Sequence, residues 1–223
     1  MEERLWNSNY IKLWAANFVL FFSFHLIVPL LPIYMNDRFH AGGSLTGIVL
    51  CGYSVTALVA RLFSGYIVDS YSRRKVLLLF YAFFALFFCG YLVASSVVLF
   101  AIIRTLHGMP FATATVSVST VMIDSLPVSR RTEGIGYFGI SNNVAMAIGP
   151  SIGLGLYHAT HNFMLLFCLS LVSAAAGLMV SYTVKCRYRP PVKDKSPVSF
   201  DRFFLTCAVP ESITMLLAAV PFG

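Results

Sequence analysis

Long apolar runs separated by short polar segments dominate this sequence and limit what it can fold into. Runs of about 20 residues or more, each long enough to cross the ~30 Å hydrocarbon core of a bilayer as a helix, occupy 13–34, 44–68, 76–95, 97–122, 134–158 and 163–184, and another starts near Phe203 and reaches Gly223. Hydrophobic residues make up 58% of the chain and charged residues 11%, which is more apolar surface than a protein could expose to water. We therefore predict an all-α membrane protein.

The basic residues gather on one side of the predicted membrane helices. If the N-terminus is cytoplasmic, thirteen of the 16 lysines and arginines fall in cytoplasmic segments: Arg4, Lys12, Arg73, Arg74, Lys75, Arg130, Arg131, Lys185, Arg187, Arg189, Lys193, Lys195 and Arg202. Arg38 falls outside, and Arg61 and Arg104 lie within spans. Because cytoplasmic loops are enriched in Lys and Arg, this distribution predicts a multi-pass protein of the cell membrane with its N-terminus inside. No small-residue cleavage site follows the first run, so we predict a retained helix and not a signal peptide.

A charged turn joins the second and third runs and must reverse the chain within a few residues. Asp69 closes one helix near the negative end of its dipole, whereas Arg73, Arg74 and Lys75 open the next helix near its positive end. Each charge therefore needs a partner outside its own helix. Gly65, one turn before Asp69, would let another backbone come close and give the acid something to hold. The basic residues could also serve only as cytoplasmic orientation charges.

The pattern Gly65-x-x-x-Asp69-x-x-x-Arg73-Arg74-Lys75 resembles the loop between helices 2 and 3 of major facilitator superfamily transporters, G-x-L-A-D-R-x-G-R-R/K. It differs at Ser70, where the family has Arg, and at Ser72, where the family has Gly. The resemblance extends over essentially the whole chain and implies the N-terminal half of such a transporter. In that family the loop latches the two halves in the outward-facing state, its acid meeting the start of a helix in the other half.

The resemblance assigns this conformational latch to Gly65, Asp69, Arg73, Arg74 and Arg61. Arg61 precedes Gly65 by one turn and Asp69 by two, so the three share a helical face. The alternative is that Arg61 is an inner-leaflet arginine that reaches toward the cytoplasm.

Arg104 is a charge inside the fourth predicted span, where an arginine costs about 2.5–3.5 kcal/mol on insertion scales. It therefore faces a cavity or a partner, unless it reaches back to the outer interface. Arg104-x-x-x-Gly108 resembles the helix 4 motif R-x-x-x-G of the family, whose arginine is linked to proton coupling. His107 stands where the family often has glutamine, and we count it among the candidate substrate-binding residues.

Polar side chains on the first and fifth spans are further candidates. Asn17, Phe21 and His25 recur every four residues on one face of the first span. An intramembrane histidine with a pKa near 6.5 can change charge at physiological pH, so His25 is a candidate for proton coupling as well as substrate binding. Asn142 and Asn143 could bind a substrate. For His25 and both asparagines, a hydrogen bond to a neighbouring helix is the alternative.

Glycines mark the expected helix crossings. Gly108 in the fourth span, and Gly149, Pro150 and Gly153 in the fifth, form a predicted helix-packing motif, because small residues let helices approach closely and proline bends a span. Gly149-Pro150-x-x-Gly153 resembles the helix 5 pattern G-x-x-x-G-P-x-x-G-G of proton-coupled antiporters in the superfamily, with two of its glycines replaced.

The predicted spans divide into two three-helix units joined by the loop 124–133, as in one six-helix half of a transporter. We predict a six-helix domain over 1–184, a basic linker over 185–202, and a seventh helix over 203–223 that begins a C-terminal half missing from this chain.

These observations predict a secondary transporter that moves a small molecule by alternating access, coupled to protons and of the efflux type. No phosphate-cradling G-x-x-x-x-G-K-S/T loop occurs, so ATP is not the expected energy source. No cofactor, metal site or nucleic-acid partner is expected, and the five cysteines are interpreted as buried thiols. Two alternatives stay open. One is a half-size protein that homodimerises, to transport or as a non-transporting subunit; the other is a small membrane enzyme that uses His25, His107 and Arg104.

Overall fold

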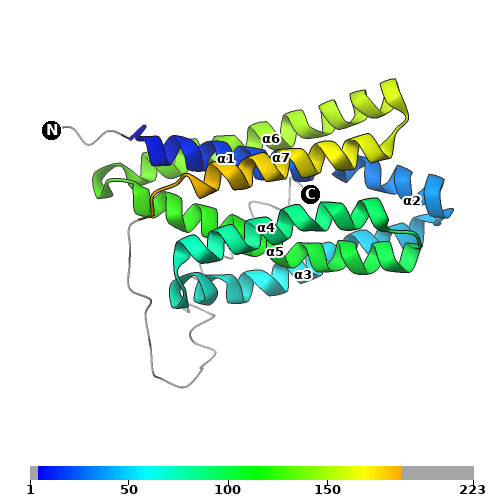
Figure 1. Cartoon of the computed structure of the whole chain (residues 1–223), viewed down its shortest axis with the longest axis horizontal. Helices are drawn as coiled ribbons and strands as arrows, with labels where there is room; N and C mark the ends of the chain where they lie inside the picture. Colours follow the sequence, from blue (N-terminus) through cyan, green and yellow to red (C-terminus); the bar gives the residue numbers. More distant parts are fainter. Residues whose placement is uncertain (1–4, 187–223) are drawn as a thin grey trace, which may run out of the picture.

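The computed structural model of the chain describes residues 5–186, and every regular element in that range is a helix. In chain order these are α1 (Ser8–His25), the 3-10 turn η1 (Val28–Leu30), α2 (Leu31–Phe39), α3 (Gly43–Ser70), α4 (Arg73–Val93), α5 (Val97–Ser125), the 3-10 turn η2 (Val128–Arg130), α6 (Arg131–Thr160) and α7 (Phe163–Tyr182). The long helices lie side by side along the long axis of the molecule (Figure 1). The predicted seventh span over 203–223 and nearly all of the predicted linker lie outside the described residues.

Within residues 5–186, five segments are long and apolar enough to cross a membrane: Ser8–Phe39, which holds α1 and α2, and the helices α3, α4, α5 and α7. The fifth predicted span, 134–158, corresponds to α6, which has 30 residues and packs against α1 and α7. It holds Asn142, Asn143 and Pro150. The segments follow the predicted order and confirm the all-α membrane fold.

The first span is two helices and not the single helix expected over 13–34. α1 ends at His25, η1 follows, and α2 continues to Phe39. Proline has no N–H to donate to the preceding turn, and Pro29 and Pro32 remove two such donors close together. Each lies in the first turn of its element, where a helix has no internal acceptor for an N–H.

α5 is the centre of the bundle and contacts α1, α3 and α4. α4 and α7 pack against each other, and α1 packs against α6 and α7. Half of the apolar window of α5 is buried inside the bundle, against 22% for α3. α3 therefore presents a long face outward from the described part of the chain.

Glycines permit two close helix crossings. At Gly108 of α5 an added Cβ would overlap the carbonyl oxygen of Tyr53 and the hydroxyl of Thr56 on α3. At Gly149 of α6 it would lie 2.9 Å from the Cβ of His25. At Gly153, one turn on, it would overlap the carbonyl oxygen of Leu26. The predicted packing glycines therefore lie where α3 meets α5 and where α6 meets the break that follows α1.

The four cysteines described by the structure are free thiols, but they are less buried than expected. Cys51 and Cys168 are exposed on α3 and α7, and Cys89 and Cys186 are half-buried. The expectation of buried thiols is wrong for the first two, because an apolar span in lipid can carry a cysteine on its outer surface as well as inside the bundle.

We predict that Gly153→Ala lowers the free energy of unfolding by about 1–3 kcal/mol, because the added methyl group would overlap the backbone of Leu26 and force α6 away from α1. Thermal unfolding of the purified protein in detergent, followed by tryptophan fluorescence, measures the change. Gly155→Ala is the matched control, since a Cβ there meets nothing within 4 Å. Equal unfolding midpoints for the two variants would contradict the close α1–α6 contact.

Candidate functional site: a charge clamp and a buried arginine

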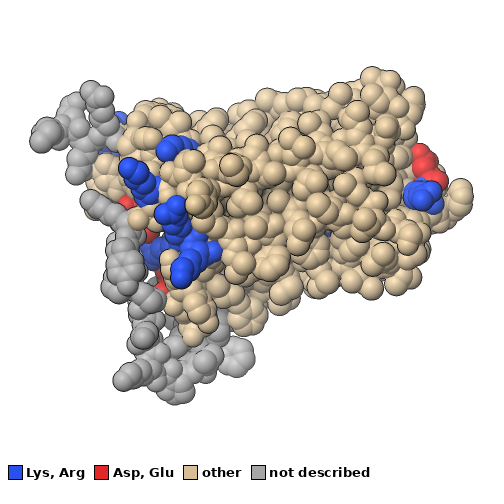
Figure 2. Space-filling view, in the orientation of Figure 1, with Lys and Arg blue, Asp and Glu red and all other residues tan. Residues whose placement is uncertain are grey.

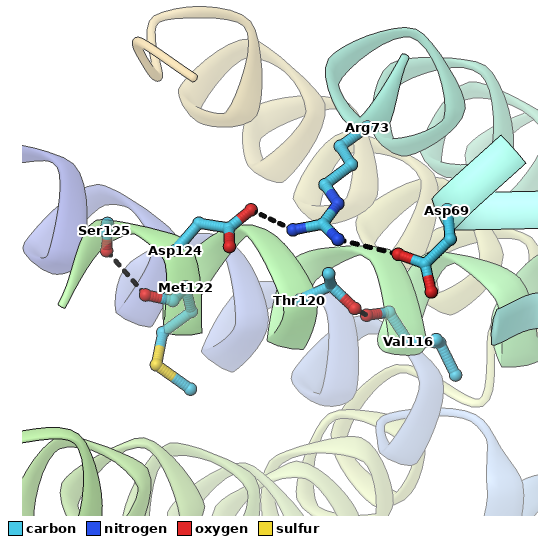
Figure 3. Close-up of polar contacts among 7 residues, drawn as sticks. All are labelled: Asp69, Arg73, Val116, Thr120, Met122, Asp124 and Ser125. Atoms are coloured by element: carbon cyan, nitrogen blue, oxygen red, sulfur yellow. Dashed lines mark hydrogen bonds and ion pairs between the residues drawn. The ribbon is translucent and has the colours of Figure 1, made fainter. Parts of the chain in front are cut away.

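Three charged side chains meet at the end of the bundle where α3 turns into α4. Arg73, the first residue of α4, donates from Nη2 to Oδ1 of Asp69 at 2.6 Å and from Nη1 to Oδ2 of Asp124. Figure 3 shows the guanidinium of Arg73 between the two carboxylates, with Asp69 on one side and Asp124 on the other. Asp69 lies in the last turn of α3 and Asp124 in the last turn of α5. We call these three residues the charge clamp, because they tie three helix ends together.

Helix dipoles explain why the clamp has this composition. An acid in the last turn of a helix faces the negative end of the dipole, and an arginine at the first position faces the positive end. Each charge is unfavourable in its own helix, and each is offset by opposite charge from another helix. The structure thus supplies the external partners that the charges of the turn require.

The two acids of the clamp differ in exposure. The side chain of Asp69 is 56% exposed, whereas those of Asp124 and Arg73 are 17% and 20% exposed. Asp124 is therefore mostly enclosed by the described helices, whereas more than half of the Asp69 side chain stays open. A cavity of about 290 Å³ lies beside the clamp and is lined by both acids and by Gly65. Sequence reasoning missed Asp124, although an acid in the last turn of an apolar run beside a basic turn is a detectable signal.

The other predicted latch residues lie apart from the clamp. Arg74 donates to the carbonyl oxygen of Tyr182 at 2.9 Å. It thereby gives a hydrogen-bond donor to a backbone carbonyl in the last turn of α7. Gly65 faces open space, because a Cβ added there meets nothing within 4 Å. Arg61 is exposed on α3, and the described residues give no ion pair between it and Asp69.

Arg104 lies deep in the bundle, 3% exposed, among aromatic rings. Its guanidinium carbon is 4.1 Å from the centre of the Tyr53 ring and 5.3 Å from that of Phe24. Nη1 donates to the hydroxyl of Tyr91 at 3.2 Å, and this hydroxyl lies 2.7 Å from Nδ1 of His107. These five residues are here named the arginine cluster; they join α1, α3, α4 and α5.

The order of donors in the arginine cluster follows from the fact that arginine can only donate. The Tyr91 oxygen accepts from Arg104, so its own proton is available for Nδ1 of His107. A neutral His107 then carries its proton on Nε2. Neither Arg104 Nε nor the Tyr53 hydroxyl has a hydrogen-bond partner in the described range 5–186.

A second polar contact joins α1 to α6. Asn17 is buried and donates from Nδ2 to the hydroxyl of Ser141 at 2.8 Å and to Oδ1 of Asn142. This is the interhelical alternative left open for Asn142, while Asn143 is exposed. An amide–hydroxyl bond of this kind stabilises helix association in lipid.

His25 is the last residue of α1 and lies next to Phe24 of the arginine cluster. Its Nδ1 is 2.9 Å from the carbonyl oxygen of Phe21, and its ring packs against Phe24 with centroids 5.1 Å apart. Phe21 and His25 are half-buried, so the predicted face of the first span divides between an interhelical contact and a partly open surface.

The structure therefore brings Arg104 and His107 together and pairs Asn17 with Asn142. Sequence reasoning missed the residues that make these contacts, Tyr53, Tyr91, Phe24 and Ser141. Their positions follow from which helices are neighbours, and the spacing within one span carries no signal for that.

Comparison with known proteins agrees with this architecture. A model of the Major Facilitator Superfamily matches residues 13–221. This chain belongs to the major facilitator superfamily. It is 26% identical over 189 residues to the Na(+), Li(+), K(+)/H(+) antiporter of Planococcus maritimus, covering 82% of this chain and 43% of that protein. It is 24% identical over 173 residues to Multidrug resistance protein 2 of Bacillus subtilis (strain 168), covering 77% and 43% respectively.

Among solved superfamily structures, the POT family transporter PepTSo matches with a TM-score of 0.74 at 15% identity, over 87% of this chain and 40% of that one. This similarity shows the fold alone. The chain spans under half of the length of each of the two sequence relatives.

The unequal burial of the clamp's acids leads to a prediction about stability. Asp124→Asn should lower the free energy of unfolding by about 1–2 kcal/mol, because it leaves a partly buried Arg73 with one carboxylate fewer. Asp69→Asn should cost less than about 1 kcal/mol, since that carboxylate is mostly exposed. Thermal unfolding of both variants at the same salt concentration checks the order. A larger loss for Asp69→Asn would contradict it.

Proposed function

We propose that this chain forms the N-terminal half of a secondary transporter that moves a small molecule by alternating access, coupled to protons and in the direction of efflux. Membership of a transporter superfamily supports the class. The names of two relatives, an antiporter and a multidrug resistance protein, support proton coupling and export. The function is transport and not catalysis, and it needs no cofactor.

The observation that carries this proposal is the charge clamp with its exposed acid. Arg73 holds Asp69 at the turn while more than half of the Asp69 side chain stays open. Arg73 thus fixes the position of Asp69, and the exposed part of the carboxylate stays accessible to a further partner. Asp69 is the conformational latch: in one state its open face contacts the C-terminal half, and in the other state that contact is broken.

The clamp also makes α3, α4 and α5 move together. Their ends are joined through one guanidinium, so a force on Asp69 is passed to α5, which carries Arg104. Rocking of one half against the other is the motion that this class of transporter uses. The clamp thereby couples the latch to the interior of the bundle.

Coupling and substrate binding belong to the interior. Arg104 and His25 are the proton-coupling residues, and Phe21, His25 and His107 contribute to the substrate site together with Asn142 and Asn143. Asn17 acts indirectly, because its bonds to Ser141 and Asn142 fix the position of α6 beside α1.

The N-terminus is cytoplasmic in this proposal. Figure 2 shows lysines and arginines gathered at the end of the molecule where the N-terminus and the α3–α4 turn lie. Lys12 and Arg74 lie at the end of α7, where they donate to the carbonyl oxygens of Thr183 and Tyr182. This asymmetry supports the proposal that this end is cytoplasmic, since cytoplasmic segments of membrane proteins are enriched in basic residues.

The partner of Asp69 is a C-terminal half of the same transporter. The outward face of α3, with exposed Arg61 and open Gly65, is the surface for it. The relatives are more than twice as long as the stretch they share with this chain, which leaves room for such a half.

Asp69→Asn should abolish transport by the protein in the length its gene encodes and leave folding intact. The amide keeps the shape of the side chain but removes the charge that the latch uses. Substrate flux in proteoliposomes measures transport, and size-exclusion chromatography measures folding. Asp37→Asn, at an exposed acid on α2, is the control. Normal flux with Asp69→Asn would remove the latch from the mechanism.

His25→Ala should change the pH dependence of transport between about pH 5.5 and 8 while leaving expression unchanged, because an imidazole titrates in this range. We expect the rate to become less sensitive to pH, measured as initial flux at a series of pH values. His158→Ala, at an exposed histidine on α6, is the control. An unchanged profile for His25→Ala would return His25 to the structural residues.

A further inference from the structure

Arg104 is a buried cation without a buried counter-charge in the described chain. The acids between residues 5 and 186 are Asp37, Asp69, Asp124 and Glu133, and each lies in the first or last turn of its helix. Tyr91 and two aromatic rings offset part of the charge, but none of them is anionic. An unpaired charge in a low-dielectric interior is costly, so a partner is expected.

The unpartnered atoms around Arg104 are all of one kind. Arg104 Nε is a donor, and the Tyr53 hydroxyl can donate as well. The Tyr53 ring lies beside Arg104 and His107: its centre is 4.1 Å from the guanidinium carbon and 6.0 Å from the imidazole centre. A positive charge with two unpartnered donors is an arrangement that can bind an anion.

The ring of Phe24 covers this group on the side of α1. Phe24 is half-buried and stacks on Tyr53, with ring centres 5.0 Å apart and planes 19° apart. α1 ends one residue after Phe24, at His25, where the break of the first span begins. The aromatic cover therefore lies in the last turn of α1, and to expose Arg104 the Phe24 ring would have to leave Tyr53 and Phe111.

We propose that Arg104, Tyr53 and His107 form the binding site for an anionic group of the substrate, so that this transporter carries organic anions, with an aromatic part replacing Phe24 against Tyr53. This inference rests on the proposed function and gives its substrate class. It adds a role to the proton coupling that the helix 4 resemblance implies for Arg104. Binding of an inorganic cation would need oxygen ligands, and the described core offers it no carboxylate.

The test uses the protein in the length its gene encodes, in lipid nanodiscs at pH 7. Three probes share one ring system and differ in charge: 1-naphthoate, 1-naphthamide and 1-naphthylmethylammonium. We expect 1-naphthoate to bind about tenfold or more tightly than the other two, as hydrogen bonds to a charged group allow. Calorimetric titration measures the three affinities.

Variants identify the residues responsible. Arg104→Gln and Arg104→Lys should weaken 1-naphthoate binding about tenfold to a hundredfold and leave 1-naphthamide binding unchanged. Tyr53→Phe should weaken 1-naphthoate binding while keeping or raising the unfolding midpoint, since it removes a hydroxyl that has no partner among residues 5–186. The Tyr53→Phe variant tests the site even if the Arg104 variants fail to fold. Arg38→Gln, at an exposed arginine, is the control for net charge.

Several results would overturn the anion site. One is equal affinity of the wild-type protein for 1-naphthoate and 1-naphthamide, as expected if an acid from elsewhere in the protein already neutralises Arg104. Another is an equal loss of affinity for 1-naphthoate and 1-naphthamide in the Arg104 variants, which would mean that Arg104 has a structural role. A third is unchanged 1-naphthoate binding in Tyr53→Phe.

Flux measurements separate this inference from the proposed function. Arg104-dependent binding of 1-naphthoate without any flux in proteoliposomes would contradict the transporter and keep the anion site. Flux of the ammonium probe or the amide, but not of 1-naphthoate, would keep the transporter and contradict the anion site.

Discussion

Lipid offers no hydrogen bonds to a polypeptide, and this constraint shapes the whole chain. Every described element that crosses the hydrocarbon core is helical, because a helix satisfies its own backbone. Apart from the exposed Arg61, the described charges lie near helix ends or find partners within the bundle. The charge clamp is the first solution: Arg73 sits between two carboxylates at the edge of the membrane. Arg104 is the second, where rings and one hydroxyl hold a cation deep inside.

Helix packing in lipid depends on close approach of the helices. Apolar side chains gain no hydrophobic free energy from contact with one another, because acyl chains are equally apolar. Gly108 brings α5 onto the backbone of α3, and Gly149 and Gly153 bring α6 onto the end of α1. The second contact is made where prolines have already interrupted the first span. The break therefore does not weaken the bundle, because α6 fills the space against it. Both crossings lie beside residues of the arginine cluster, Tyr53 and Phe24, so they also fix the geometry of the interior.

The helices could be predicted from the sequence because each property used there is local. Apolar length and the charged turn are read along a single segment, and they predicted the all-α fold and the order of the spans. The break in the first span was present as Pro29 and Pro32, but apolar length alone concealed it. The contacts of Asp124, Tyr91 and Tyr53 are not local. They depend on which helix lies beside which and on the rotation of each, and a single sequence carries little signal for either. The same reason makes Asn17 an interhelical residue where periodicity grouped it with Phe21 and His25.

The two arginine sites differ in a way that matters for alternating access. Arg73 has two carboxylates, so its charge is compensated within this half whether or not anything else binds, and its energy can change only if Asp69 gains or loses a further contact. Arg104 has donors around it and no acid in the described chain, so its energy depends on what enters the bundle. A ligand can shift a conformational equilibrium only by its difference in affinity between the states. In the proposed mechanism the Phe24–Tyr53 cover would supply such a difference, because an anion would meet Arg104 only when the rings have moved. The clamp would then pass that change from α5 to Asp69 at the end of α3, so that substrate and latch would bias the same motion.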